Sequence, residues 1–524
     1  MAEIRRVAGR PVVDYMARDY DSLLQAMQAM IPYKLPEWTE HTSEADFGNV
    51  LLQLFAHMGD VLSYYQDRVA NESFLGTAQT RRSVIEHLRL IGYKLATAAP
   101  ASTVLTVSVP ATAAGVITIN RGDAFATASQ RDRPSVRFEY AAEAPLVVDV
   151  GALPIDPATN RKRFQVPVEE GRLIRDELVG ISDGTPNQRF QLAHSPLILR
   201  STGTAGQVNR DVTLLTRLGG VPTEWTLQES LAFSRELLRE YVIEIDDADR
   251  AAVIFGDGVL GAFPEAGAEV RATYRVGGGA SGNVGANTIQ TIVGAPQLAL
   301  LGAQATNSTP TSGGSERESI ERAVQHAPAV FRSLKRAVTA ADYEALALDF
   351  PGVGRVRARA TNWNTVTMAV APAGGGLVSD ILRANLLAYF EDKRPLSTRI
   401  EIGQVDYVPI LVIAEIGVLP YYSRDDVAQQ VRTAAGALLT FDEVDFAIPI
   451  YLSRFYEVIE DVEGVRFANI TQFRREDRLP DPANPSIQIE PSGKITLGEN
   501  EIPMPPTAPQ YAGGLSVVVV EGGY

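Results

Sequence analysis

Three glycines, Gly277, Gly279 and Gly282, have the G-x-G-x-x-G spacing of a loop that holds a dinucleotide phosphate. They directly follow residues 269–276, whose β-branched and aromatic side chains predict a strand. Phosphate binding also requires a helix that begins at the glycines and an acidic residue about 20 positions further on. The acidic residue is missing, because the chain has no charged residue between Arg275 and Glu316. The helix is missing too, because residues 283–289 contain Gly285 and Asn287 and show no helical spacing of apolar residues. We therefore expect these glycines to shape the backbone, and we expect no cofactor.

The remaining reactive side chains do not form a recognisable catalytic or metal-binding set. The five histidines contain no H-x-x-x-H pair, and the absence of cysteine excludes disulfides, thiolate nucleophiles and cysteine-bound metals. Asp257 lies in a D-G turn, where a carboxylate usually accepts hydrogen bonds from local backbone amides. We expect no catalytic residue and no metal site. Carboxylates such as Glu457 and Glu460 leave a glycosidase-like pair open as an alternative.

Length and charge restrict the class of protein further. A chain of 524 residues should hold about three or four domains. The formal net charge of −15 disfavours nucleic-acid binding, which depends on lysine and arginine. No apolar run reaches about 18 residues, so we expect no membrane insertion. The N-terminus has no signal-peptide pattern, and assembly in a reducing cytoplasm fits the lack of cysteine.

The first hundred residues predict helices at 22–31, 43–65 and 81–91. Ser43 and Asp46 have the spacing of a loose capping box at the start of the second helix. An apolar stripe recurs along that helix at intervals of three and four residues: Phe47, Val50, Leu51, Leu54, Phe55, Met58, Val61, Leu62 and Tyr65. Such a stripe is typical of an internal core, but few other helices are available to cover it. We therefore expect part of it to contact another chain.

Beyond residue 100 the pattern predicts a multidomain α+β protein. Alternating and β-branched runs predict a sandwich-like or barrel-like all-β region, and later helices alternate with strands. Tyr343–Val353 and Tyr456–Val465 both read as a helix stopped by a glycine before a strand. The expected domains are 1–100 helical, 101–276 β-rich, 277–315 an uncharged connector, 316–408 and 409–475 two small α+β modules, and 476–524 a tail with a terminal strand.

Three of these segments have open alternatives. Residues 277–315 form either a buried connector or an extended arm along a neighbouring subunit. The strand at 515–520 has no partner nearby in the sequence, so its partner could belong to another subunit. The two α+β modules are small, and we expect them to dock on each other or on other subunits, with Tyr343 and Tyr456 as candidate interface residues.

Five motifs occur together in a fixed order: F-G-D-G at 255–258, a tyrosine and arginine strand ending in glycines at 274–279, G-N-V at 282–284, G-G-S-E-R-E-S-I at 313–320 and R-A-V-T-x-x-D-Y-E at 336–344. In this order they resemble the signature of baseplate J-like proteins, the wedge components of contractile phage tails and contractile injection systems. Residues 46–54 and 71–93 also resemble the opening of that family. The resemblance covers most of the chain.

The resemblance implies a structural wedge subunit, not an enzyme, in the sixfold ring around a central spike. Its implied partners are copies of itself, a larger wedge subunit held through the N-terminal helices, and sheath-proximal and hub or spike proteins. The implied location is a phage tail-like contractile particle assembled in the cytoplasm. The alternative is a glycan-binding or glycan-cleaving tail protein, for which an aromatic-lined groove would be needed; Trp225 is the one tryptophan of the β region.

Overall fold

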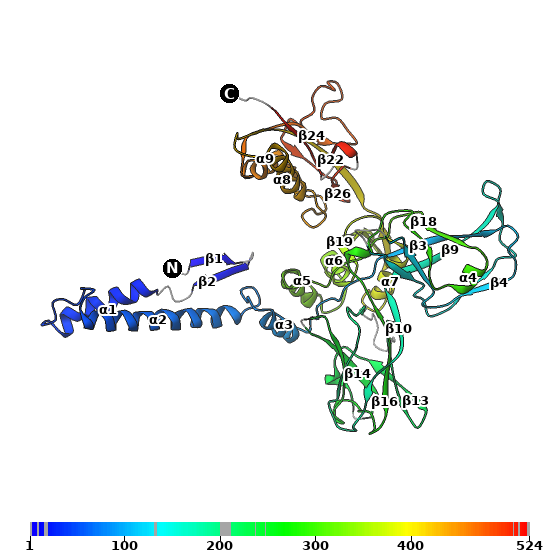
Figure 1. Ribbon diagram of the computed structural model, residues 1–524, viewed down its shortest axis with the longest axis horizontal. Helices are drawn as coiled ribbons and strands as arrows, with labels where there is room; N and C mark the ends of the chain where they lie inside the picture. The colour runs from blue at the N-terminus through cyan, green and yellow to red at the C-terminus, as the bar shows by residue number, and fades with distance from the viewer. Residues whose placement is uncertain are drawn as a thin grey trace. The chain divides into compact units, whose positions relative to one another are not determined.

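The computed structural model of the chain divides into two compact units, Met1–Leu95 with Glu318–Leu334, and Ala96–Arg317 with Lys335–Tyr524. We call them the helical unit and the larger unit. Figure 1 shows the order of their elements along the chain. The structure describes residues 3–7, 10–14, 19–129, 134–199, 211–235, 237–246, 248–506, 508–511 and 514–520.

The helical unit is built from four helices and a β-hairpin. The hairpin pairs β1 (Glu3–Val7) with β2 (Arg10–Asp14), and the helices are α1 (Tyr20–Lys34), α2 (Phe47–Glu72), α3 (Arg81–Leu90) and α5 (Ile320–Ser333). The expected helical N-terminal region is confirmed. Helix α5, which we expected in the first α+β module, instead packs on α3, and the Tyr93 hydroxyl donates to the Glu318 carboxylate over 2.7 Å.

Two seven-stranded sheets form the β region of the larger unit. The first follows the order β10-β16-β12-β13-β14-β15-β11 and the second β17-β5-β6-β9-β3-β18, with β8 beside β9. The strands of the first are β10 (Arg172–Ile181), β11 (Arg189–Gln191), β12 (Val212–Leu218), β13 (Val221–Leu227), β14 (Glu240–Ile245), β15 (Ala251–Phe255) and β16 (Glu269–Val276). Those of the second are β3 (Ser102–Pro110), β5 (Ala124–Thr127), β6 (Arg137–Glu139), β8 (Ile155–Asp156), β9 (Arg161–Glu170), β17 (Ile289–Ile292) and β18 (Gln304–Asn307), while β4 (Val116–Ile119) pairs with β7 (Leu146–Asp149).

The uncharged segment 277–315 belongs to the second sheet. Strand β17 pairs with β5 and β18 pairs with β3, so the segment supplies both ends of the sheet. The same two strands contact each other, which curls the sheet into a barrel around Leu105, Phe125 and Phe138. An arm along a neighbouring subunit is therefore ruled out for these strands, because their backbone groups pair within the chain.

The first α+β module contains α6 (Ala340–Asp349), β19 (Val353–Asn362), β20 (Thr365–Pro372), α7 (Asp380–Phe390) and β21 (Arg399–Gly403). Strand β20 lies in the centre, antiparallel to β19 and parallel to β21. Helix α6 ends before Gly352, whose φ of +92° reverses the chain into β19. The predicted glycine stop at this repeat is confirmed.

The second α+β module repeats the helix, glycine and strand order. Helix α9 (Leu452–Glu460) leads through Gly464 into β24 (Val465–Arg475). The long strand β22 (Asp406–Val418) lies between β24 on one side and both β26 (Glu501–Met504) and β27 (Ser516–Val519) on the other, while helix α8 (Arg424–Ala437) covers the core. The terminal strand β27 finds its partner β22 inside the chain, so a partner in another subunit is not needed. The expected multidomain α+β fold class is confirmed.

Candidate interaction surface

The turn before α2 is fixed by polar side chains. Asp46 is the N-cap, and its carboxylate accepts from the Asn49 amide over 2.9 Å and from the Trp38 indole over 3.1 Å. Asn49 in turn donates to the Ser43 carbonyl and accepts from the Gln28 side chain. The predicted capping box at Ser43 is wrong by three residues, because Asp46 and not Ser43 caps the helix.

One face of α2 packs within the helical unit through small side chains. The buried residues of this 26-residue helix are Asn49, Ala56 and Asn71. Gly59 lies on the same side, where an added Cβ would stand 2.8 Å from the Leu23 Cδ1 of α1. Successive helical residues are turned by about 100°. The large apolar side chains therefore point away from α1.

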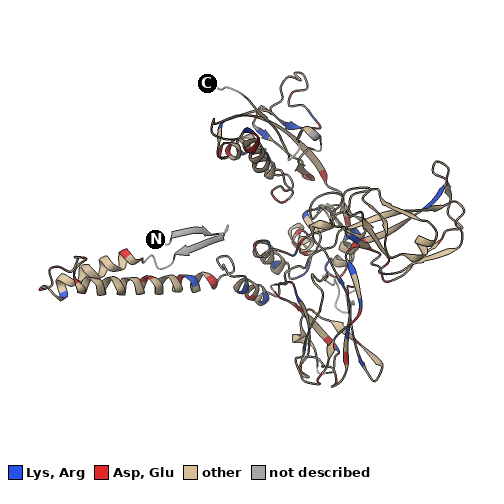
Figure 2. Ribbon diagram, viewed as in Figure 1, with Lys and Arg blue, Asp and Glu red and all other residues tan. Residues whose placement is uncertain are grey.

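The opposite face of α2 leaves its large apolar side chains exposed. All eight predicted interface residues on this helix are at least 38% exposed, and Val61, Tyr64 and Val69 extend the surface. We call the following set the α2 apolar face: Phe47, Val50, Leu51, Leu54, Phe55, Met58, Val61, Leu62, Tyr64, Tyr65 and Val69. Figure 2 shows that few charged residues interrupt α2. A contiguous exposed apolar surface is a candidate interaction site.

The centre of this face has a regular spacing. Phe47, Leu51, Leu54 and Met58 are separated by four, three and four residues, and Met58, Leu62, Tyr65 and Val69 repeat the same intervals. An 11-residue period corresponds to about 3.67 residues per turn, close to that of an undistorted helix. A partner helix could therefore follow this face along its whole length while remaining nearly straight.

The far end of α2 turns sharply into α3 around Glu72. The Glu72 carboxylate accepts from the backbone amides of Gln79 and Thr80 and from the Thr80 hydroxyl over 2.8 Å. The His87 ring lies 2.8 Å from the Glu72 carbonyl. Burial raises the pKa of Glu72, but hydrogen bonds from Ser83, Thr80 and Gln79 outweigh it and hold the pKa below its usual value. The carboxylate thus acts as a structural fastener of the corner.

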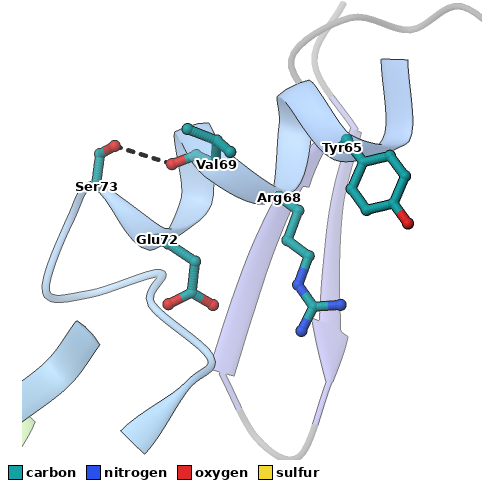
Figure 3. Close-up of a pocket in the computed structure, with 5 residues that line it drawn as sticks. All are labelled: Tyr65, Arg68, Val69, Glu72 and Ser73. Carbon is teal, nitrogen blue, oxygen red and sulfur yellow. Dashed lines mark hydrogen bonds between the residues drawn. The ribbon is translucent and has the colours of Figure 1, made fainter. Parts of the chain in front are cut away.

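A hollow of about 420 Å³ opens beside this end of α2 and is lined by Tyr65, Arg68, Val69, Glu72 and Ser73. Figure 3 shows the side chains of Tyr65, Arg68 and Glu72 on one side of the helix, while the Ser73 hydroxyl bonds back to the Val69 carbonyl over 2.9 Å. Because the Glu72 carboxylate is hydrogen-bonded at the α3 corner, Tyr65, Arg68 and Val69 are the lining side chains that face the open hollow. It continues the α2 apolar face.

The two tyrosines predicted as interface residues lie elsewhere. Tyr343 is 1% exposed and stacks on Phe390 at a centroid distance of 5.6 Å. Tyr456 packs against the core of the second module, where its hydroxyl accepts from the Ile470 amide over 3.1 Å. Both side chains therefore stabilise their own modules, and we remove Tyr343 and Tyr456 from the candidate surface.

The glycine loop binds carboxylates of its own chain. Gly277 and Gly278 have φ values of +134° and +89°, and a Cβ on Gly278 would lie 2.9 Å from the Ala98 Cβ. The Gly278 amide donates to Glu170 over 2.6 Å, and the Ala280 amide donates to Glu316 over 2.9 Å. A single 3-10 turn and then β17 follow. The prediction that these glycines shape the backbone is confirmed.

Asp257 and Ser182, which could be taken for catalytic residues from the sequence, have structural roles. The Asp257 carboxylate accepts from the amides of Val259 and Leu260, and these bonds lower its pKa. Residues 180–184 read G-I-S-D-G, the spacing of a nucleophile elbow, which our sequence interpretation overlooked. Ser182 is 3% exposed, and its hydroxyl donates to the Pro264 carbonyl and accepts from Gln188. The nucleophile geometry requires an exposed hydroxyl, so this match is accidental.

Neither a metal-binding cluster nor a membrane-spanning helix occurs in the part of the chain that the structure describes. No cluster of three or more His, Cys, Asp or Glu side chains there could hold a metal ion. None of the helices described combines the length and the apolar character needed to cross a bilayer.

Two protein families match parts of the chain. Residues 19–90 match the N-terminal domain of bacteriophage baseplate proteins, which includes α1, α2 and α3. Residues 335–403 match the baseplate J-like central domain, which includes the first α+β module. Among curated proteins, none matches the sequence significantly.

Two solved structures align with most of the chain, but their TM-scores and sequence identities are low. A chain of the anti-feeding prophage baseplate, solved by cryo-electron microscopy with sixfold symmetrisation, has 11% identity and a TM-score of 0.32, covering 93% of this chain and 98% of that one. A chain of the TssK-TssF-TssG baseplate subcomplex of the type VI secretion system has 8% identity and a TM-score of 0.31, covering 68% of this chain and 96% of that one. With TM-scores this low, neither likeness carries weight for function.

Proposed function

Because this chain is a baseplate J-like protein, with a bacteriophage baseplate N-terminal domain and a baseplate J-like central domain, we propose that it is a structural wedge subunit of a contractile injection particle. In this role it contributes to a sixfold ring around the spike and transmits sheath contraction to that ring. It acts through its contacts and not through catalysis.

The observation that carries this proposal is the α2 apolar face. A helix that exposes Leu54, Phe55, Met58 and Leu62 to water loses the free energy that burial would supply, roughly 2–3 kcal/mol for each large side chain. The whole α2 apolar face, on a helix of 26 residues, suits an intermolecular helix bundle. We propose that helices of a second copy and of a larger wedge subunit cover this face.

The polar corners at both ends of α2 support the same role. Hydrogen bonds to Asp46 hold the start of α2, and hydrogen bonds to Glu72 hold its end, so the helix is fixed at both ends before any partner binds. A binding element that is ordered before association loses less conformational entropy when it binds. The remaining proposed partners are sheath-proximal baseplate proteins and the hub or spike.

The experiment compares two variants in particles produced by cells. Leu54→Asp/Phe55→Asp places two charges in the centre of the α2 apolar face and should abolish incorporation of the chain. Gln66→Asp adds a carboxylate to the same helix beside that face and should incorporate normally. Limited proteolysis must show intact larger units in both variants.

Either of two results would contradict the proposal. Normal incorporation of Leu54→Asp/Phe55→Asp would show that the face is not covered in the particle. General unfolding of the purified variant would show that these side chains belong to an internal core. The glycan-binding alternative gains no support from Trp225, because this side chain is 7% exposed and its indole donates to Thr216.

A further inference from the structure

We propose that residues 172–276 form a hinged domain, which is held against the barrel by a latch centred on Arg275 and swings while both parts stay folded. The described strands of the first sheet all lie within these residues, whereas those of the second sheet lie before and after them in the chain. We call residues 172–276 the inserted β domain, because the chain leaves the barrel before them and returns to it afterwards. The inference goes beyond the wedge role and does not depend on it.

The inserted β domain and the barrel have separate apolar cores. Phe138 and Val166 belong to the core of the barrel, whereas Trp225 and Phe255 belong to the core of the inserted β domain. Domains of one chain move relative to each other unless a large apolar interface joins them. Each core therefore remains intact when the angle between the two domains changes.

The two connecting segments meet at a neck of glycines. Strand β9 leads into β10 through Gly171, which has a φ of +122°, and β16 is followed by Gly277, which has a φ of +134°. A Cβ on Gly277 would lie 2.7 Å from the Gly171 Cα, so the two backbones pass in direct contact. The Gly171 amide donates to the Arg137 carbonyl of the barrel, and the Gly277 amide donates to the Pro196 carbonyl of the inserted β domain. Backbone rotation at a few such residues is how a hinge absorbs a change of angle.

Arg275 crosses the neck and forms the centre of the latch. It belongs to β16 of the inserted β domain and is 1% exposed. Its Nη1 atom donates to the Glu169 carboxylate of β9 over 2.5 Å, and its Nη2 atom donates to the Glu170 carbonyl over 3.0 Å. Within the described part of the chain, the buried Nε atom of Arg275 has no hydrogen-bond partner. The latch thus joins the two domains through polar contacts that are not fully satisfied.

The Glu170 carboxylate opposes the latch. Burial raises its pKa above the usual value, and the neighbouring Glu316 adds to the rise. The hydrogen bond from the Gly278 amide, 2.6 Å long, and the charge of Arg275 lower this pKa by less. The closed neck therefore disfavours the charged form of Glu170.

Two ion pairs outside the neck also hold the inserted β domain. The Arg317 guanidinium donates to the Asp249 carboxylate over 2.6 Å, and the Lys335 ammonium donates to the Glu229 carboxylate over 2.6 Å. The side chains of Asp249, Glu229 and Lys335 are 41 to 57% exposed. Water and salt screen such pairs, so they break and form again at little cost.

The test is a distance measurement in the full-length chain. Because the chain lacks cysteine, Ala152→Cys and Glu224→Cys place one spin label on the barrel and one on the inserted β domain. Labelled chains are diluted with unlabelled chains, so that double electron–electron resonance reports distances within one molecule. Arg275→Met should raise the ratio of open to closed molecules by at least about tenfold, because it removes two hydrogen bonds of a buried charged group. Adding Glu170→Gln should reverse part of this opening, because it removes the charge that the closed neck disfavours.

Two controls separate a hinge from general damage. Arg161→Met removes three hydrogen bonds inside the barrel and should leave the distance between the domains unchanged. A second label pair, Ala152→Cys with Gln290→Cys, lies within the barrel and should report one distance in every variant. If Arg275→Met does not fold, Arg317→Gln breaks an outer ion pair instead and should raise the open fraction to a smaller extent.

An unchanged distance between the domains in both Arg275→Met and Arg317→Gln would overturn the hinge. A change in the barrel pair that accompanies the opening would also overturn it, because the barrel would then not stay folded as the inserted β domain moves. Further opening on addition of Glu170→Gln would overturn the role assigned to the Glu170 charge.

Discussion

Helices α2 and α8 both carry apolar side chains at helical spacing, but only α8 buries them inside the chain. Val427, Val431 and Ala435 of α8 pack against β22, α9 and β27. Helix α2, almost twice as long, buries Asn49, Ala56 and Asn71 and exposes its large apolar residues. The amphipathic pattern therefore identifies an apolar face, whereas the elements around that face decide whether it is a core or an interface.

The two helices are held in place by different interactions. The α8 module is stabilised by apolar burial around Phe455 and Phe473. Both ends of α2 are instead held by polar corners, in which Asp46 and Glu72 accept at least two hydrogen bonds each. The first arrangement gives stability to an isolated chain, and the second keeps a binding helix ordered while its apolar face remains available.

The largest expected effect is the difference in stability between a charged substitution on α8 and one on α2. Val431→Asp buries an unpaired carboxylate at a position with 0% exposure and should destabilise the second module by roughly 4 kcal/mol or more. Leu54→Asp should leave the thermal unfolding of the free chain almost unchanged. Differential scanning calorimetry of both variants checks the contrast, and equal destabilisation would place α2 in a core.

A smaller effect is expected at the α1-α2 turn. Gly48→Ala would put a Cβ 2.2 Å from the Trp38 ring, displacing the indole from Asp46 at a cost of about 1–2 kcal/mol. Gly59→Ala is the matched control, because its neighbour is the flexible end of Leu23. The measurements are urea unfolding of α1 and α2 and tryptophan fluorescence. A Gly48→Ala chain as stable as Gly59→Ala would contradict the close packing of Trp38.

The α2-α3 corner should depend on pH through Glu72. Its folded-state pKa lies below the ordinary value of 4.5, so its contribution is fully present above that value and is lost as the pH falls through the folded pKa. Glu72→Gln should weaken the corner by about 1 kcal/mol at neutral pH and remove this acid dependence. Hydrogen exchange of the Gln79 and Thr80 amides measures both. Glu86→Gln, an exposed change on α3, should alter neither the stability of the corner nor its dependence on pH. If the Glu72→Gln corner still weakened in acid, the pH dependence would belong to another group.

The smallest effect is expected at Asp257. Asparagine retains an oxygen that can accept from the Val259 and Leu260 amides, so Asp257→Asn should assemble and unfold as the parent does. Particles that assemble normally but lose a glycan-cleaving activity present in the parent would identify Asp257 as a catalytic group.

Local patterns predicted the parts of the fold that depend on neighbouring residues. The helix, glycine and strand repeats ending in β19 and β24 were predicted because their signals lie within about 20 residues. Strand β10 was missed, since Arg172–Ile181 alternates polar and apolar residues irregularly around two bulges. Strands β17 and β18 were hidden in a segment rich in Gly, Thr and Asn.

Long-range pairing could not be predicted in the same way. The partner of β27 is β22, about 100 residues earlier, and α5 packs on α3 across more than 200 residues. For the candidate site, the sequence identified the apolar residues of α2 because their spacing is helical. Their exposure depends on the position of α1 and on Gly59, which periodicity does not reveal. Tyr343 and Tyr456 were misassigned for the same reason.

The most direct test of the account is chemical labelling of α2 in the free chain and in the particle. Because the natural chain has no cysteine, Met58→Cys introduces a single thiol at the centre of the α2 apolar face, where Met58 is 58% exposed. Ser397→Cys, on the exposed segment before β21, verifies that the reagent reaches the assembled particle if it labels there. We predict rapid maleimide labelling of Met58→Cys in the free chain and at least about tenfold slower labelling in particles. Equal labelling rates in both states would contradict the proposal that other subunits cover this helix.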